Sequence, residues 1–193
     1  MRAPLGVFAV AFAVLICSEQ ATPSACQCFD HSDRTHNPGS GKSFAVGKDP
    51  LKVVQKCIIE RDEAVRNGKR LDDCVRLVDV DEHHALSAAI SLAEQEEIQL
   101  LVSNLKFEVW LRWHAERKRA PLTSNQLDEL VTKLGLVKKK ILSPTFPFDG
   151  VHDACALART SDPDMRPGRK GPNPSSAMPI LVDLLQGNQT QGN

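Results

Sequence analysis

The stretch DEHHALSAAISLAEQEEIQLLVSNLKFEVWLRWHAERKRAPLTSNQLDELVTKLGL, residues 81–136, carries the strongest regular pattern in this chain. It contains both tryptophans, Trp110 and Trp113, and no proline or glycine occurs in it before Pro121. Apolar residues recur at the spacing of three and four that places side chains on one helix face. We therefore expect helices here, with an apolar stripe formed by Leu86, Ile90, Ala93, Leu101, Leu105, Phe107, Trp110 and Leu111.

The first of these helices would be unusually long. A single helix from Asp81 to Arg119 exceeds the common length of a helix in a globular protein. We therefore expect a bend in it, near residues 94–97 or near residues 103–104. The cations that close it, residues 117–119, suit the negative end of a helix dipole.

A second helix is predicted after the turn at Pro121. Thr123 and Gln126 have the spacing of a capping box, and Gly135 stands where a C-terminal cap belongs. The two helices then form a hairpin, in which the tryptophan helix packs on residues 123–134. The residues expected to point inward from the second helix are Leu127, Leu130, Val131 and Leu134.

The remaining segments also favour helices. Asp49-Pro50 is a helix start, and Gly68 follows the expected helix as its cap. Residues 71–80 have helical spacing and could form a short helix or a strand, of which the helix is favoured. Residues 151–158 are predicted to form a further short helix. The predicted fold class is all-α: a small disulfide-assisted helical bundle with a central helical hairpin and a disordered C-terminal tail.

The N-terminus has the pattern of a secretory signal peptide. Arg2 precedes an apolar run over residues 7–16 that is too short to span a bilayer. Cleavage could follow Ser18 or Ala25. The predicted divisions are a signal peptide (1–25), a cysteine-bearing N-terminal arm (26–48), a helical domain (49–158) and a disordered tail with a short apolar helix (159–193).

Removal of the signal peptide leaves five cysteines for an oxidising compartment, where most cysteines are bridged. Because five is odd, at least one of them stays a thiol or pairs between chains. We expect two bridges, with the connectivity open. The disulfide candidates are Cys26, Cys28, Cys57, Cys74 and Cys155.

The tail contains two further short motifs. Residues 160–178 are rich in proline and lack apolar periodicity, which predicts a disordered linker. Residues 181–185 have the Leu-x-x-Leu-Leu pattern, which could dock in a partner's groove or on the protein's own body. Gly-basic-basic sequences at 67–70 and 167–170 resemble peptide-processing sites, but a glycine cap followed by solvated charges is favoured.

Several patterns suggest ligands, and none is favoured over its structural alternative. Residues 37–43 look like a phosphate-binding loop, but His36 stands where that motif requires glycine. The set Cys26, Cys28, His31 and His36 matches no standard zinc spacing. His83 and His84, near Asp79, Asp81 and Glu82, point in different directions if they lie on a helix.

No catalytic motif stands out, so we expect no enzyme, no cofactor and no resident metal. A protein partner is the expected ligand, with no nucleic acid and no membrane span. The net charge is zero, although residues 106–193 carry 13 Lys and Arg against 9 Asp and Glu. The predicted partner-binding patch in this half consists of Arg112, Arg117, Lys118, Arg119, Lys138, Lys139 and Lys140.

Phe107-x-x-Trp110, Pro121 and the leucine pattern of residues 127–136 resemble the tryptophan-bearing helical unit of secreted oomycete effectors. The translocation motif of that family is absent. The resemblance implies that Trp110 lies between helices in the core and that function lies on the surface. These observations predict a secreted, effector-like virulence protein that binds a macromolecular partner. The alternative is a precursor of secreted signalling peptides or a cytokine-like helical ligand.

Overall fold

Two parallel strands, β2 (Asp73–Asp79) and β3 (Gln99–Asn104), form the centre of a four-stranded sheet. The computed structural model describes residues 26–29, 49–68, 73–80, 85–138 and 141–186. In this part of the chain the sheet order is β1-β2-β3-β6. The edge strands β1 (Cys26–Phe29) and β6 (Ser175–Ser176) run antiparallel to their neighbours.

The parallel pair is joined by the helix α3 (Leu86–Gln95), which forms the crossover that parallel strands require. Both central strands are buried along most of their length, because helices cover both faces of the sheet. Leu100 and Leu101 are each 0% exposed although they are neighbours in sequence. Such strands appear in the sequence as continuous apolar runs.

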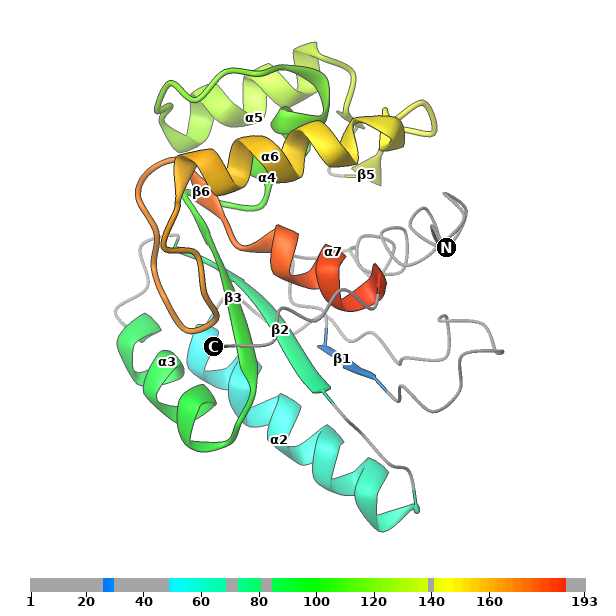
Figure 1. Ribbon diagram of the computed structural model, residues 1–193, viewed down its shortest axis with the longest axis vertical. Helices are drawn as coiled ribbons and strands as arrows, with labels where there is room; N and C mark the ends of the chain where they lie inside the picture. Colours follow the sequence, from blue (N-terminus) through cyan, green and yellow to red (C-terminus); the bar gives the residue numbers. More distant parts are fainter. Residues whose placement is uncertain (1–25, 30–48, 69–72, 81–84, 139–140, 187–193) are drawn as a thin grey trace.

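One face of the sheet is covered by α3 and by α2 (Pro50–Arg66), as Figure 1 shows. Asp49 caps α2 by accepting a hydrogen bond from the Leu51 amide at 3.0 Å. Gly68 follows with φ 76°, the left-handed conformation of a helix C-terminal glycine. The predicted start and end of this helix are confirmed.

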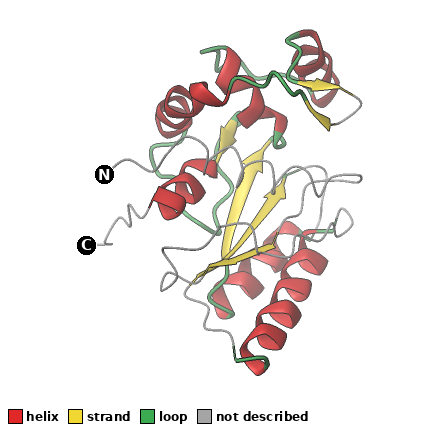
Figure 2. Ribbon diagram, turned by 90° about the vertical axis from the view of Figure 1, so that its right-hand side faces the viewer, coloured by secondary structure: helices red, strands yellow, loops and turns green. Residues whose placement is uncertain are grey.

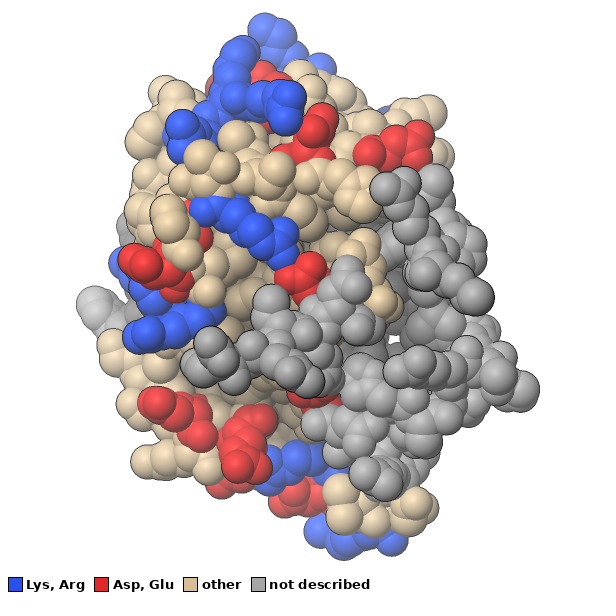
Figure 3. All heavy atoms as spheres, viewed as in Figure 1, with Lys and Arg blue, Asp and Glu red and all other residues tan. Residues whose placement is uncertain are grey.

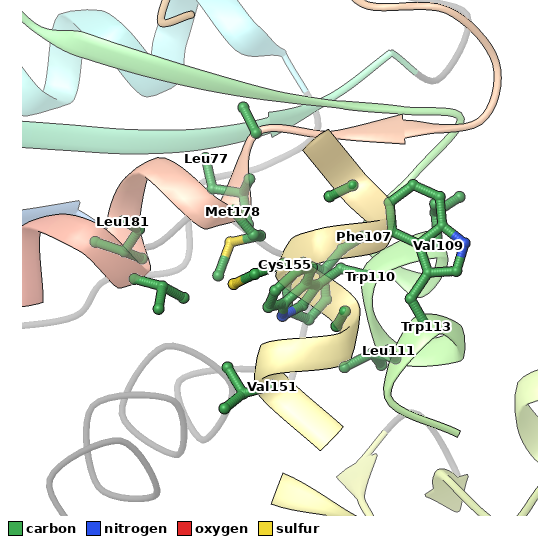
Figure 4. Packing of buried hydrophobic residues seen from close by; sticks show 14 of the residues in the cluster. Leu77, Phe107, Val109, Trp110, Leu111, Trp113, Val151, Cys155, Met178 and Leu181 are labelled. Carbon is green, nitrogen blue, oxygen red and sulfur yellow. The ribbon is translucent and has the colours of Figure 1, made fainter. Parts of the chain in front are cut away.

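The other face packs against the second half of the chain (Figure 2). Leu77 and Leu101 point into this cluster together with Trp110, Cys155 and Met178. Figure 4 shows Leu77, Trp110, Cys155 and Met178 meeting between strand and helices. The elements are α4 (Glu108–Ala115), α5 (Ser124–Lys133), β4 (Val137–Lys138), β5 (Ile141–Leu142), the 3-10 turn Phe148–Gly150, α6 (Val151–Ser161) and α7 (Met178–Gln186).

The prediction of an all-α bundle is wrong, because the fold is mixed α/β. The expected long helix over residues 81–119 contains α3, then β3, then α4. The segment 71–80 contains β2, where we favoured a helix. In both segments, an apolar run buried from two sides also satisfied helical spacing, which is why periodicity alone misassigned them.

The capping box predicted at the start of the second hairpin helix is confirmed. The hairpin packs on a sheet, however, and not within a helical bundle. Thr123 and Gln126 form both hydrogen bonds of a capping box at the start of α5. Leu127 and Val131 are buried in the same cluster as Trp110, and Leu130 is half-buried. The expectation that Leu134 points inward is wrong, because its side chain is 38% exposed. The helix predicted at residues 151–158 is α6.

The predicted disordered tail is also wrong over its described part. Residues 162–177, which we call the edge segment, run beside β3 and include β6. The amides of Gly168 and Ala177 donate to the carbonyls of Leu100 and Val102, at 2.7 and 3.1 Å. The prolines of this segment do not prevent the pairing, because the amides that bond to β3 come from Gly168 and Ala177. Leu181 and Val182 of α7 are buried in the core, so this apolar turn docks on the protein's own body.

No disulfide is present among the described residues, which contradicts the expected disulfide framework. Cys57, Cys74 and Cys155 are all buried without forming a bridge. They occupy apolar positions facing the helices and act as small hydrophobic residues. Cys26 and Cys28 lie in β1, with Arg76 and Cys74 as backbone partners.

Replacing Trp110 by alanine tests the core. Trp110 is 0% exposed, and its ring meets the His114 ring edge-on at 4.8 Å between centroids. Trp110→Ala should lower the free energy of unfolding by about 3–5 kcal/mol in urea denaturation, because the cavity would form in a packed interior. Leu134→Ala, at a side chain 38% exposed, is the matched control and should cost much less. An equal loss of unfolding free energy in the two variants would contradict the burial of Trp110 in the core.

Candidate functional site at the carboxyl ends of the parallel strands

A row of polar residues crosses the sheet where the two parallel strands end. Asp79 is the register partner of Ser103, and Ser103 is the partner of Ser176 on β6. Partners in adjacent strands lie on the same face of a sheet. The partnered row two residues earlier, Leu77 and Leu101, is apolar and buried. The sheet therefore changes from apolar to polar at its carboxyl edge.

Hydrogen bonds fix the position of this edge. The hydroxyls of Ser103 and Ser176 are 2.9 Å apart, and both side chains are 0% exposed. The amide of Val80 donates to the Ser103 carbonyl at 3.0 Å, which continues the strand pairing past Asp79. Asp79 itself is half-buried. Within this half-buried residue, the carboxylate oxygen Oδ1 is buried.

Asn104, the last residue of β3, is held by the edge segment. Its side-chain amide donates to the Gly171 carbonyl at 2.9 Å, and it is 7% exposed. Gly171 has no room for a side chain, because a β-carbon there would collide with the Asp162 carboxylate and the Ser175 hydroxyl. Arg169 donates to Asp162 at 2.5 Å and holds the segment in this conformation.

Glu108 adds a second carboxylate at this end of the molecule. It lies in the first turn of α4, four residues after Asn104 in the chain, and is half-buried. A carboxylate is favourable at a helix N-terminus because it meets the positive end of the dipole. Figure 1 shows that β3 ends beside the layer that contains α4. The described residues contain no group of three or more His, Cys, Asp or Glu able to hold a metal.

The predicted partner-binding patch is only partly a surface. Arg112 is 4% exposed and donates to Glu116 at 2.6 Å and to the Ala120 carbonyl at 3.1 Å. Lys118 approaches the other Glu116 oxygen at 3.1 Å. Burial acts to raise the pKa of Glu116, but hydrogen bonds from both cations outweigh it and hold that pKa below its ordinary value.

The other members of that patch lie further out. Arg117 is 70% exposed and pairs with Asp153 at 3.1 Å, and Arg119 donates to the Thr160 carbonyl at 3.3 Å. Lys138 is exposed on β4. Lys139 and Lys140 lie outside the described residues. Partner binding by these residues remains a prediction.

The sequence motifs that suggested ligands mostly fall outside the described part. This holds for the loop 37–43, for His31 and His36, and for residues 81–84. The first basic pair, residues 69–70, also lies there. In the second, Gly168 bonds to β3 and Arg169 is paired with Asp162, so this site belongs to ordered structure.

Cys155 is unsuited to be a nucleophile. Burial raises the pKa of its thiol to about 11, although the nearby Arg159 acts in the opposite direction. The thiolate that reacts is therefore scarce at neutral pH. Arg159 is itself ion-paired with Asp183 of α7.

Comparison with known proteins places this fold in a family. The family described as RloB-like protein matches residues 20–185, which include every helix and strand above except the last residue of α7. The chain belongs to the RloB-like family. No curated protein and no solved structure matches it. Among the described residues, no helix of this RloB-like protein is long and apolar enough to cross a membrane.

The family assignment corrects the resemblance to oomycete effectors. The residues that carried it, Phe107, Trp110 and the leucines after Pro121, are core positions of an α/β fold. The match also begins at residue 20, inside the predicted signal peptide, which lies outside the described residues. Together with the absence of described disulfides, this removes the basis for a secreted virulence effector.

Sequence reasoning missed the polar edge of the sheet. It considered Asp79 only as a helix neighbour of the His83-His84 pair. It considered residues 103–104 only as a possible helix bend, and it gave Glu108 no role. The signal was present as two short apolar runs, each followed at once by polar residues and separated by a helix. This is the pattern of a parallel strand pair, and it predicts a ligand site at the carboxyl ends.

His114 gives a pH-dependent test of the packing around Trp110. Burial lowers the pKa of His114 from 6.5 to about 4, although its hydrogen bond to the Trp110 carbonyl acts in the opposite direction. In the unfolded chain the imidazole binds a proton near pH 6.5, so folding opposes protonation between pH 6.5 and 4. Stability is fully present above pH 6.5 and should fall by roughly 3 kcal/mol as the pH drops to 4.

The measurement is urea denaturation at several pH values, compared with His114→Phe. That variant should lose the part of the pH dependence that His114 causes. His152→Gln, at an exposed histidine on α6, should leave the dependence unchanged. If His114→Phe and wild type show the same dependence, the imidazole is not buried in its neutral form.

Proposed function

We propose that this RloB-like protein binds a divalent cation together with a phosphate ester at the carboxyl ends of β2 and β3. The observation that carries the proposal is the register pairing of Asp79 with Ser103 at the ends of adjacent parallel strands. In α/β sheets, ligands bind outside the carboxyl ends of the strands. A carboxylate beside hydroxyl and amide groups is a donor set of oxygens for a hard cation.

Magnesium fits the number of carboxylates available. It keeps several waters and is commonly held by one or two carboxylates, with substrate phosphates completing its coordination. Asp79 is the last residue of β2, and Glu108 follows the end of β3 by four residues in the chain. A dedicated protein cage of three or more acidic ligands is therefore not required. The sequence adds Asp81 two residues after Asp79, outside the described residues.

The chemistry of such a site is the hydrolysis of a phosphate ester. A bound cation neutralises charge on the phosphate oxygens and lowers the pKa of a coordinated water. Ser103 and Asn104, both fixed by hydrogen bonds, keep the strand end in one position. Rigid positioning of the ligands is what such a site requires. This proposal replaces the expectation that the protein uses no metal and is no enzyme.

Manganese binding tests the proposal directly. Asp79→Asn and Glu108→Gln should each weaken Mn²⁺ binding by about tenfold or more in isothermal titration, equivalent to about 1.4 kcal/mol. Each should also lower Mg²⁺-dependent hydrolysis of a small phosphodiester such as bis(p-nitrophenyl) phosphate. Glu129→Gln, at an exposed carboxylate on α5, is the matched control. Equal affinity in Asp79→Asn and Glu129→Gln, with both proteins folded, would refute the site.

A second candidate function is the binding of a macromolecular partner by the exposed cations after α4. Arg117 and Lys118 are each 70% exposed, and Figure 3 shows Lys and Arg side chains gathered at the top of the molecule. A surface of one charge attracts a partner of opposite charge and speeds its association. This candidate keeps the partner-binding role expected from the sequence, but for a smaller patch that excludes the buried Arg112.

Charge reversal tests the patch. Arg117→Glu combined with Lys118→Glu should abolish capture of an anionic partner at low salt, and added salt should weaken capture by the wild type. Lys52→Glu on α2, an exposed lysine on the opposite side of the sheet, is the control. Retention of the same partners by the double variant would exclude the patch.

A further inference from the structure

Arg76, in the middle of β2, is buried without enough acceptors for its hydrogen bonds. Its side chain is 0% exposed. Nη2 donates to Glu60 Oε2 at 2.7 Å, whereas Nε and Nη1 are buried and have no hydrogen-bond partner. A guanidinium carries five N–H donors and keeps its charge in proteins. This residue therefore holds several strong donors away from water.

Leaving such donors unmet is unfavourable. A buried donor without an acceptor loses its hydrogen bonds to water and forms none in the protein. The resulting cost in folding free energy is larger for a charged group. Burial lowers the pKa of Arg76 to about 9, because removal from water disfavours the charged form. An apolar residue would suit a position between Cys74 and Val78 better. The arginine is thus a feature that packing alone does not explain.

A second cation lies near the carboxylate that Arg76 binds. Lys56 approaches the other oxygen of Glu60 at 3.7 Å, so two cations share one carboxylate. Lys56 is 34% exposed and Glu60 18%, and both lie on α2. This trio connects the buried guanidinium to the surface beside α2.

We propose that Arg76 and Lys56 form a binding site for a small oxyanion, a carboxylate or phosphate group, at the interface of α2 and β2. The anion accepts hydrogen bonds from Nε and Nη1 of Arg76, and Lys56 lies at the entrance. Arginine favours these two groups because its planar donors match their oxygens. The site lies on the sheet face that α2 covers, whereas Asp79 and Ser103 share the face with Leu77 and Leu101. It is therefore separate from the cation site proposed above.

Thermal unfolding with added anions tests the site. Acetate and inorganic phosphate are titrated separately into the full-length protein, with sodium chloride holding the ionic strength constant. A ligand that binds only the folded state raises the melting temperature in a saturable way. We expect such a rise with at least one of the two anions, and the more potent anion identifies the group that the site takes.

Three variants locate the effect. Arg76→Gln should abolish the anion-dependent rise, and Lys56→Gln should shift it to severalfold higher anion concentrations. Lys52→Gln, at an exposed lysine one turn earlier on α2, should behave like wild type. If Arg76→Gln does not fold, the comparison of Lys56→Gln with Lys52→Gln decides alone. No rise in wild type, or an equal rise in Lys56→Gln and Lys52→Gln, overturns the proposal.

Discussion

The fold depends on the pairing of two strands that are each buried from both sides. β2 and β3 run parallel, and their side chains point alternately into two separate hydrophobic clusters. Val75 and Leu77 contact the cluster with the tryptophans, whereas Cys74 and Val78 contact the cluster with α2 and α3. Neither cluster could form without the other, because each would leave one face of the sheet in water. This constraint explains why the helices are divided between two layers.

The same constraint decides what the sequence could predict. Signals that depend on a few neighbouring residues are confirmed, such as Asp49 as a cap, the Thr123–Gln126 capping box and Gly68 after α2. These signals describe local hydrogen bonds and need no knowledge of the fold. The burial of Trp110 is confirmed for a similar reason, because a large aromatic residue in an apolar stripe seldom faces water.

What could not be predicted depends on distant partners. Leu100 and Leu101 fit a helix stripe until a second strand, provided by residues 73–79, makes a sheet. The proline-rich segment 162–177 has a composition that predicts disorder. Its backbone hydrogen bonds are made to the edge of β3, which its own sequence does not reveal. The candidate site shares this dependence. Asp79, Ser103 and Ser176 are far apart in the chain and form a row only through the sheet register.

The two proposed sites use opposite chemistries on opposite faces of one strand. At the carboxyl end of β2, Asp79 provides a negative group beside neutral hydrogen-bonding residues. Within the same strand, Arg76 provides a positive group beneath α2. A strand with helices on both sides can thus position polar groups on each face without the two sets meeting. Because Asp79 and Arg76 lie in the same strand, their separation is fixed by the strand backbone.

The edge segment has a consequence for how the chain folds during synthesis. Ser103 and Ser176, which bond across β3 and β6, are separated by 73 positions in sequence. Until the ribosome has released the C-terminal part, the outer edge of β3 has no partner from this segment. An open edge of an apolar strand is a template for pairing with other chains. The edge of β3 therefore stays open to such pairing until residues 168–177 have emerged, and contacts over such separations form slowly.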